Sequence, residues 1–75
     1  MNKYVISFAD LDNNITWIES ISAQNLNQAQ TKLIAAKTKE WELDEECFDY
    51  EWREFVEYLF SIGIIVGDIA DIESF

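Results

Sequence analysis

The sequence predicts one α+β domain over residues 1–75, in which a small antiparallel sheet is covered by two helices. Two stretches near the N-terminus alternate apolar and polar residues with the period of a strand. Two later stretches repeat apolar residues with the period of a helix. Hydrophobic residues make up 49% of the chain, which is enough for a core and excludes a disordered acidic tail. A chain of 75 residues leaves no room for a second domain.

The first element is a hairpin, with strands predicted at 3–9 and 15–21. Its first strand places Tyr4, Ile6 and Phe8 on one face, and its second strand alternates in the same way. The residues between the strands, 10–14, are Asp, Leu, Asp and two Asn. Asp and Asn tolerate left-handed backbone and bond locally, so this stretch is predicted to be the hairpin turn.

The same turn partly matches a calcium-binding loop of the EF-hand type. Asp10, Asp12 and Asn14 occupy the first three ligand positions. However, Ile15 stands where the loop needs glycine, and Ile21 stands where it needs a bidentate glutamate. The hairpin turn is therefore favoured over a calcium site.

The first helix is predicted at 26–39. Asn25 followed by Gln28 is typical of a capping box at a helix start. Lysines gather toward the C-terminal end of this stretch, where cations suit the helix dipole. The apolar residues at helical spacing are Leu26, Ala29, Leu33, Ile34 and Ala36.

The second helix is predicted at 47–61, followed by a stop at Gly63. A third strand at 64–66 is expected to complete the sheet of the hairpin. Residues 68–73 are expected either to begin a terminal helical turn or to extend that strand past Gly67. The apolar stripe of the second helix consists of Phe48, Trp52, Phe55, Val56, Leu59 and Phe60.

Residue types argue against an enzyme and against a bound cofactor or metal. The chain has no His to act as a general base near neutral pH. Cys47 is the only cysteine, and its acidic neighbours disfavour a thiolate, so a small buried hydrophobic residue is expected there. No apolar run reaches the roughly 18 residues that a membrane span needs. A cytoplasmic protein is therefore expected.

Charge is distributed unevenly along the chain, whose formal net charge is −10. Residues 1–39 hold four lysines against three acids, a formal charge of +1. Residues 40–75 hold Arg53 alone against twelve acids, a formal charge of −11. Ordinary soluble domains mix both signs on their surface, so this division favours a functional acidic surface over a merely solvated one. Direct binding to nucleic acid is opposed by the same charge.

Nine acids crowd into residues 40–57, which we call the acidic segment. Along a helix, such acids lie roughly 4.5–6 Å apart, a spacing comparable to the ~3.4 Å between phosphates along one DNA strand. Trp41 and either Tyr50 or Tyr58 fall outside the predicted apolar stripe and are candidates for partner contact. The candidate partner-binding residues are Glu40, Trp41, Glu42, Asp44, Glu45, Glu46, Asp49, Tyr50, Glu51, Glu54 and Glu57.

In size, charge and layout, the chain resembles phage-encoded anti-defence inhibitors, including anti-CRISPR and DNA-mimic proteins. The resemblance implies a protein that occupies the basic groove where a nuclease or a guide-RNA effector holds nucleic acid. Two alternatives stay open. One is an immunity protein or antitoxin that neutralises a basic toxin, and the other is a self-associating adaptor module. The resemblance leaves open whether the protein is a monomer or a homodimer.

Overall fold

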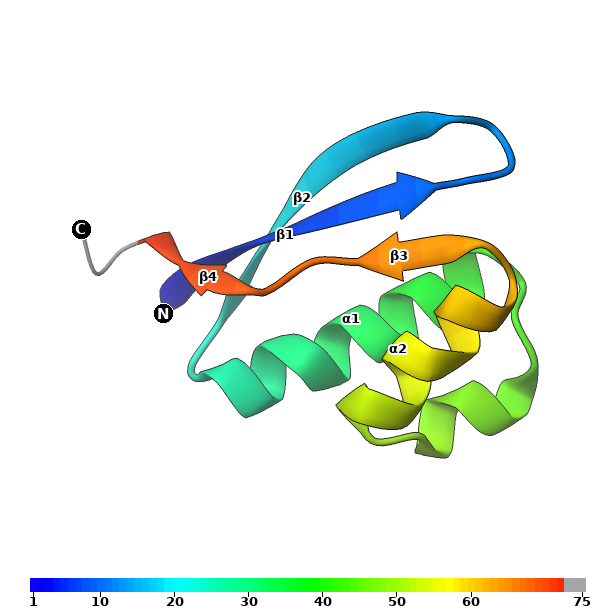
Figure 1. The fold of residues 1–75 in the computed structure, drawn as a ribbon. Helices are drawn as coiled ribbons and strands as arrows, with labels where there is room; N and C mark the ends of the chain where they lie inside the picture. Colours follow the sequence, from blue (N-terminus) through cyan, green and yellow to red (C-terminus); the bar gives the residue numbers. More distant parts are fainter. Residues whose placement is uncertain (73–75) are drawn as a thin grey trace.

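The computed structural model describes residues 1–72 and confirms the predicted α+β fold, an antiparallel sheet with two helices (Figure 1). The chain forms a hairpin, two helices joined through a short 3₁₀ helix (η1), and two short strands. The elements are β1 (Asn2–Asp10), β2 (Ile15–Ala23), α1 (Leu26–Glu40), η1 (Glu45–Asp49), α2 (Trp52–Ser61), β3 (Ile64–Val66) and β4 (Ala70–Asp71).

The hairpin of β1 and β2 is confirmed, with an unbroken antiparallel register from Asn2 opposite Ala23 to Asp10 opposite Ile15. Its turn is held by the side chain of Asp10, which accepts the backbone N–H groups of Asp12 and Asn13 at 3.1 and 3.3 Å. The Asn13 side chain donates to the same carboxylate at 2.7 Å, and this hydrogen bond lowers the pKa of Asp10. Asn14 takes the left-handed conformation, with φ 54°.

The predicted third strand is also confirmed. β3 pairs antiparallel with β1 on the side opposite β2, so β1 is the central strand. The sheet continues past Gly67, because β4 pairs with the other end of β1. Residues 68–73 therefore include a strand at Ala70–Asp71, and Glu73 lies outside the described residues. Gly67 lies close to Ser7 at the junction, where a Cβ atom would lie 2.2 Å from Ser7 Oγ and would force that hydroxyl to move.

The first helix is confirmed and ends one residue later than predicted, at Glu40. Asn25 Oδ1 accepts the N–H of Gln28 at 2.8 Å, and Gln28 Oε1 accepts the N–H of Gln24 at 2.7 Å, one residue before the cap. The predicted apolar face is wrong at its two ends, where Leu26 and Ala36 are exposed. The buried residues of α1 are Ala29, Leu33, Ile34, Lys37 and Thr38.

The predicted second helix is wrong over its first turn. η1 ends at Asp49, the chain is extended at Tyr50, and α2 begins at Trp52. This break removes Phe48 from the helical stripe and leaves it 51% exposed. Phe60 is 65% exposed, because it lies about 100° around the helix from the buried Leu59. Gly63 follows α2 with φ +91°, as predicted for a left-handed stop.

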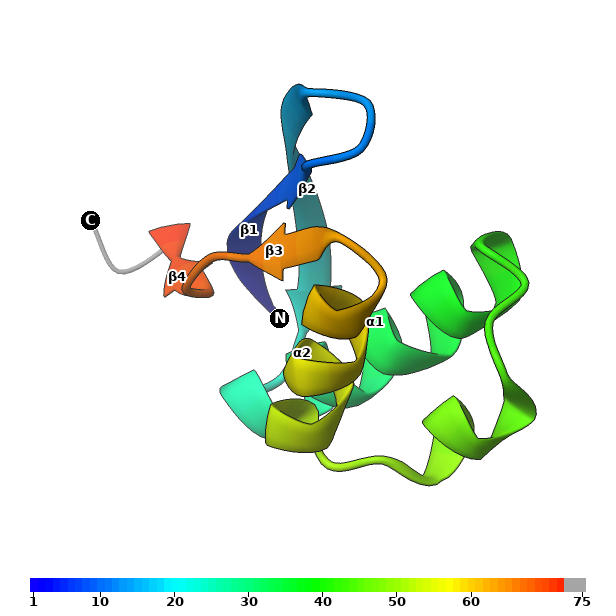
Figure 2. The same cartoon turned by 45° about the vertical axis from the view of Figure 1, so that its right-hand side comes forward.

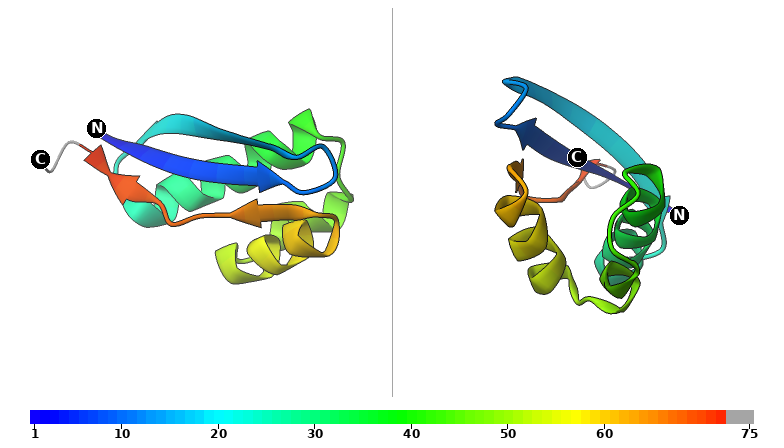
Figure 3. Two further views of the ribbon diagram at one scale, coloured as in Figure 1. Left: turned by 45° about the horizontal axis from the view of Figure 1, so that its top comes forward. Right: turned by 90° about the vertical axis from the view of Figure 1, so that its right-hand side faces the viewer.

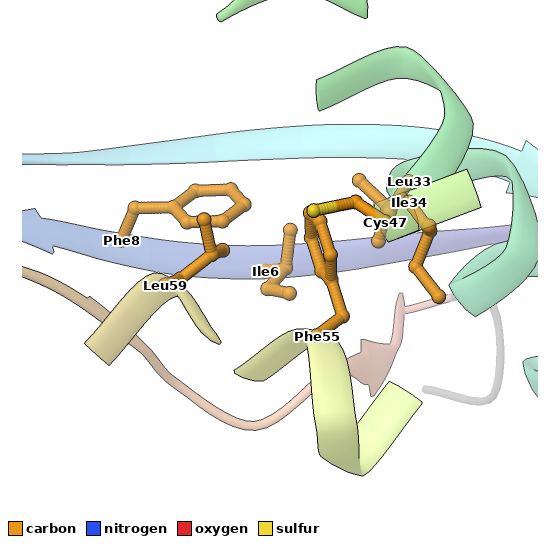
Figure 4. Packing of buried hydrophobic residues seen from close by; sticks show 7 residues of the cluster. All are labelled: Ile6, Phe8, Leu33, Ile34, Cys47, Phe55 and Leu59. Atoms are coloured by element: carbon orange, nitrogen blue, oxygen red, sulfur yellow. The ribbon is translucent and has the colours of Figure 1, made fainter. Parts of the chain in front are cut away.

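Both helices cover one face of the sheet, and the core lies between the two layers (Figures 2 and 3). The right-hand view of Figure 3 shows α1 beneath β2 and α2 beneath β3. The other face of the sheet has no covering layer in residues 1–72. The main buried cluster consists of Ile6, Phe8, Leu33, Ile34, Cys47, Phe55 and Leu59 (Figure 4).

Candidate acidic binding surface

The acidic segment spans the end of α1, the following linker, η1 and the first half of α2. η1 lies at the end of the helical layer farthest from the sheet (Figure 3, right). All nine acids of the segment are exposed to solvent. Their side chains nevertheless divide into two groups, because some have structural partners within the chain.

Four acids of the segment take part in local structure. Glu40 pairs with Lys37 at 2.8 Å. Asp44 begins η1, and its side chain accepts the N–H of Glu46 at 3.1 Å. Glu51 and Glu54 form the capping box of α2, in which Glu54 Oε1 accepts the N–H of Glu51 at 3.1 Å. These carboxylates fix helix ends, so only part of their charge is available to a partner.

The other acids of the segment are more available. Glu57 lies 3.6 Å from Arg53, but both side chains are largely in water, where such a pair contributes little. Glu42 has left-handed backbone, with φ 52°, in the linker before η1. No ion pair or side-chain hydrogen bond within residues 1–72 engages the remaining carboxylates, which we call the free acids: Glu42, Glu45, Glu46 and Asp49.

Phe48 stands among the free acids, and the sequence interpretation missed it as a surface residue. Because η1 is separate from α2, the ring of Phe48 is half exposed between Cys47, which is fully buried, and Asp49. Aromatic side chains are enriched in protein interfaces, so an exposed ring beside acidic residues is a candidate anchor. The pattern Glu51-x-x-Glu54, a capping box, is the sequence signal that could have located the break before α2.

Trp41 is partly buried and packs against the main buried cluster. Its ring meets Phe8 and Trp17 edge-on, with centroids 5.7 and 6.1 Å apart. The ammonium group of Lys37 lies over the Trp41 ring at 5.1 Å from its centroid. Trp41 therefore packs against strand and helix residues although it falls outside the predicted helical stripe, and it is half-buried.

Tyr50 is half-buried in the segment between η1 and α2. Its ring contacts that of Tyr58 edge-on, with centroids 6.0 Å apart. Partial burial raises the pKa of Tyr50, and the negative charge of Glu46 adds to this effect. The Tyr50 hydroxyl therefore stays protonated near neutral pH and can act as a hydrogen-bond donor beside the free acids.

Cys47 is fully buried, as expected for a small hydrophobic residue. Burial raises the pKa of its thiol, and the charges of Asp44 and Glu46 raise it further. The thiol is therefore protonated near neutral pH and is a poor nucleophile. Within residues 1–72, no group of three or more His, Cys, Asp and Glu side chains is arranged to hold a metal ion.

Unlike the free acids, Lys37 in α1 has its charge neutralised by ion pairs within the chain. Its ammonium group pairs with Glu19 of β2 and with Glu40, and its side chain is only 5% exposed. Burial alone lowers the pKa of Lys37, but its hydrogen bonds to Glu19 and Glu40 outweigh burial and raise it. Trp17 Nε1 also donates to Glu19 at 2.7 Å. This part of the molecule therefore neutralises its charges internally.

A groove lies between α1 and α2. It has a volume of about 700 Å³ at its end near β3 and continues past Gln30, Trp52 and Arg53. Arg53 is the only cation of residues 40–75, and the groove also contains the acids Glu51, Glu57 and Asp68. No helix of the described part of the chain is long and apolar enough to cross a membrane. Comparisons with protein-family models, curated proteins and solved structures found no match for this chain.

Proposed function

We propose that the chain is a protein inhibitor that binds the basic nucleic-acid-binding groove of a nuclease or CRISPR-type effector. In this proposal the free acids take the place of phosphates, and the exposed ring of Phe48 supplies an apolar anchor. The observation that carries the proposal is the combination of three unpaired carboxylates with an exposed phenylalanine on η1, with Glu42 in the linker just before it.

The electrostatics of η1 support such a role. Free carboxylates that lack a counter-ion within the chain keep their full charge for a partner, and they speed the encounter with a basic surface. Burial of Phe48 against that surface would then slow dissociation, since apolar anchors at the centre of an interface carry much of its affinity.

Charge reversal tests this proposal without disturbing the helix caps. The test variant is Glu45→Lys with Asp49→Lys, and the matched control is Asp12→Lys with Asp68→Lys. Both pairs are exposed and both change the net charge equally, but only the first pair lies in the acidic segment. Glu51 and Glu54 are left unchanged because they cap α2.

The immobilised protein is used to capture proteins from a bacterial lysate. We expect a captured nucleic-acid-binding protein that duplex DNA or RNA displaces and that high salt releases. The test variant should bind it about tenfold or more weakly, whereas the control should bind it nearly normally. Phe48→Ser should also weaken the complex, but with little change in its salt dependence.

Two results would contradict the proposal. The first is a captured partner that nucleic acid does not displace. The second is an equal loss of binding in the test variant and in the matched control, since this would indicate a general effect of net charge.

A further inference from the structure

β2 forms a free edge of the sheet. The strand order is β2-β1-β3, and within residues 1–72 no strand pairs with the outer side of β2. Figure 1 shows β2 along the upper margin of the molecule, with β1 on one side only. The strand has nine residues and an unbroken register, so no bulge or proline interrupts it. A long, regular edge of this kind is a template for pairing with another strand.

The backbone groups on this edge can be assigned from the hydrogen bonds of β1. The N–H of Gly67 donates to the C=O of Ser7, and the N–H of Leu11 donates to the C=O of Gly63, both at 2.9 Å. Odd-numbered residues of β1 therefore direct their backbone groups toward β3, and even-numbered residues direct theirs toward β2. The register places even-numbered residues of β1 opposite odd-numbered residues of β2. The outward-pointing backbone groups of β2 are therefore those of Thr16, Ile18, Ser20 and Ser22.

The side chains of these four residues are exposed and uncharged. Ile18 is 70% exposed, the largest exposure of an isoleucine in the described chain. One end of the edge is already occupied, because Lys32 Nζ donates to the C=O of Ser22 at 2.9 Å. The groups of Thr16, Ile18 and Ser20 have no such partner within residues 1–72.

We propose that β2 pairs antiparallel with β2 of a second copy of this chain, about a twofold axis at Ile18. In this register Thr16 of each copy bonds to Ser20 of the other, and the two Ile18 side chains meet at the axis. Ile15, which is also exposed, comes to lie opposite Ile21. The strand is self-complementary in this register, as a twofold interface requires.

Two neighbouring registers are less favourable. An axis at Ser20 would need the C=O of Ser22, which Lys32 already occupies. An axis at Glu19 would place two carboxylates directly opposite each other, and like charges in that position destabilise a strand pair. The axis at Ile18 avoids both problems.

The charge distribution favours a second copy as the occupant of this edge. The only acid of β2 is Glu19, and Lys37 neutralises it. α2 lies below the opposite edge, and η1 lies against α1 at the end of the helical layer farthest from the sheet, so the proposed pairing keeps the acidic parts of the two copies away from the shared edge (Figure 3, right). The inference goes beyond the proposed function, because it concerns a different surface and is tested by a separate experiment.

Sedimentation velocity tests the proposal on the full chain, with Ile18→Lys as the test variant. Ile65→Lys is the matched control, since Ile65 is exposed on the same face of the sheet but belongs to β3. We expect the wild-type mass to rise with concentration from 8.8 kDa toward twice that value. Ile65→Lys should behave like the wild type, whereas Ile18→Lys should stay at the mass of one chain. Added salt should strengthen the association, since it screens the repulsion between two acidic copies.

Amide hydrogen exchange identifies the surface directly. The amides of Ile18 and Ser20 should exchange more slowly as concentration rises, while the amide of Leu11 should not change. A mass of one chain at every concentration would overturn the proposal. Equal dissociation of both lysine variants, or protection of these amides only when an unrelated protein is added, would also overturn it.

Discussion

The two halves of this small molecule's chain treat charge in opposite ways. In the half formed by β2 and α1, a buried lysine joins Glu19 and Glu40 in one ion-pair network. In the half formed by η1 and α2, Arg53 is the only cation, and the free acids face water. The difference shows that acid content alone does not define a binding surface. What matters is which carboxylates the fold already uses for ion pairs and helix caps.

The largest expected effect on stability comes from removing Lys37, the cation of the ion-pair network with Glu19 and Glu40. Lys37→Met should lower the free energy of unfolding by about 2–3 kcal/mol, because it leaves Glu19 without its cation in a half-buried position. The double variant Lys37→Met with Glu19→Gln should recover part of this loss, since it removes the unpaired charge. Urea unfolding provides the measurement, with the exposed Lys39→Met as a control that changes stability by less than about 0.5 kcal/mol. Equal effects at both lysines would contradict the buried network.

The pH dependence of the melting temperature also tests the ion pairs of Lys37. The pKa of Lys37 is raised above the ordinary value of 10.5, so folding favours its protonated form. Its contribution to stability is therefore complete below pH 10.5 and is lost as the pH rises through the raised value. The melting temperature of the wild type should fall more steeply across this range than that of Lys37→Met. Parallel curves would show that Lys37 does not titrate with the fold. Tyr50 titrates in both proteins, so the difference between the curves isolates Lys37.

A smaller change in stability is expected from variants of Glu54, an acid of the acidic segment that caps α2. Glu54→Ala should cost about 1 kcal/mol, because it removes the acceptor for the N–H of Glu51 at the start of α2. Glu54→Gln removes the same charge but keeps an acceptor, so its stability should stay close to that of the wild type. Thermal unfolding of the pair distinguishes the two roles. Equal losses would mean that charge, rather than the cap, is what Glu54 contributes.

The smallest expected effect comes from salt on the isolated protein. Neighbouring like charges on a helix destabilise it by about 0.2–0.5 kcal/mol for each pair, and salt screens them. The melting temperature should therefore rise with added sodium chloride, and the rise should be smaller in Glu45→Gln with Asp49→Asn. A melting temperature that falls steadily with salt would indicate that the Lys37 network outweighs the repulsion among the acids.

Much of the fold follows from local patterns in the sequence. The alternation of Tyr4, Ile6 and Phe8, together with the Asp- and Asn-rich turn, was sufficient to predict the hairpin, because both signals lie within a few residues. The third strand was predicted from 64–66 for the same reason. The first helix was placed within one residue at its C-terminal end.

The candidate site was less predictable, because it depends on where one helix starts. The apolar residues from Phe48 to Phe60 fit a single helical stripe, yet the capping box at Glu51 divides the stretch. That division exposes Phe48 and gives Glu51 and Glu54 structural roles. Similarly, the packing of Trp41 on Phe8 and Trp17 brings together residues far apart in sequence, and no local periodicity reports such contacts.

The close approach of Gly67 to Ser7 affects whether a further strand can pair with the edge formed by β3 and β4. Because the chain bends there, the edge opposite β2 consists of one strand of three residues and one of two. Neither is long enough to template a further chain, and Asp68 adds negative charge along that margin. The proposed strand pairing therefore has one extensible edge per molecule, so it stops at two chains and does not lead to fibres.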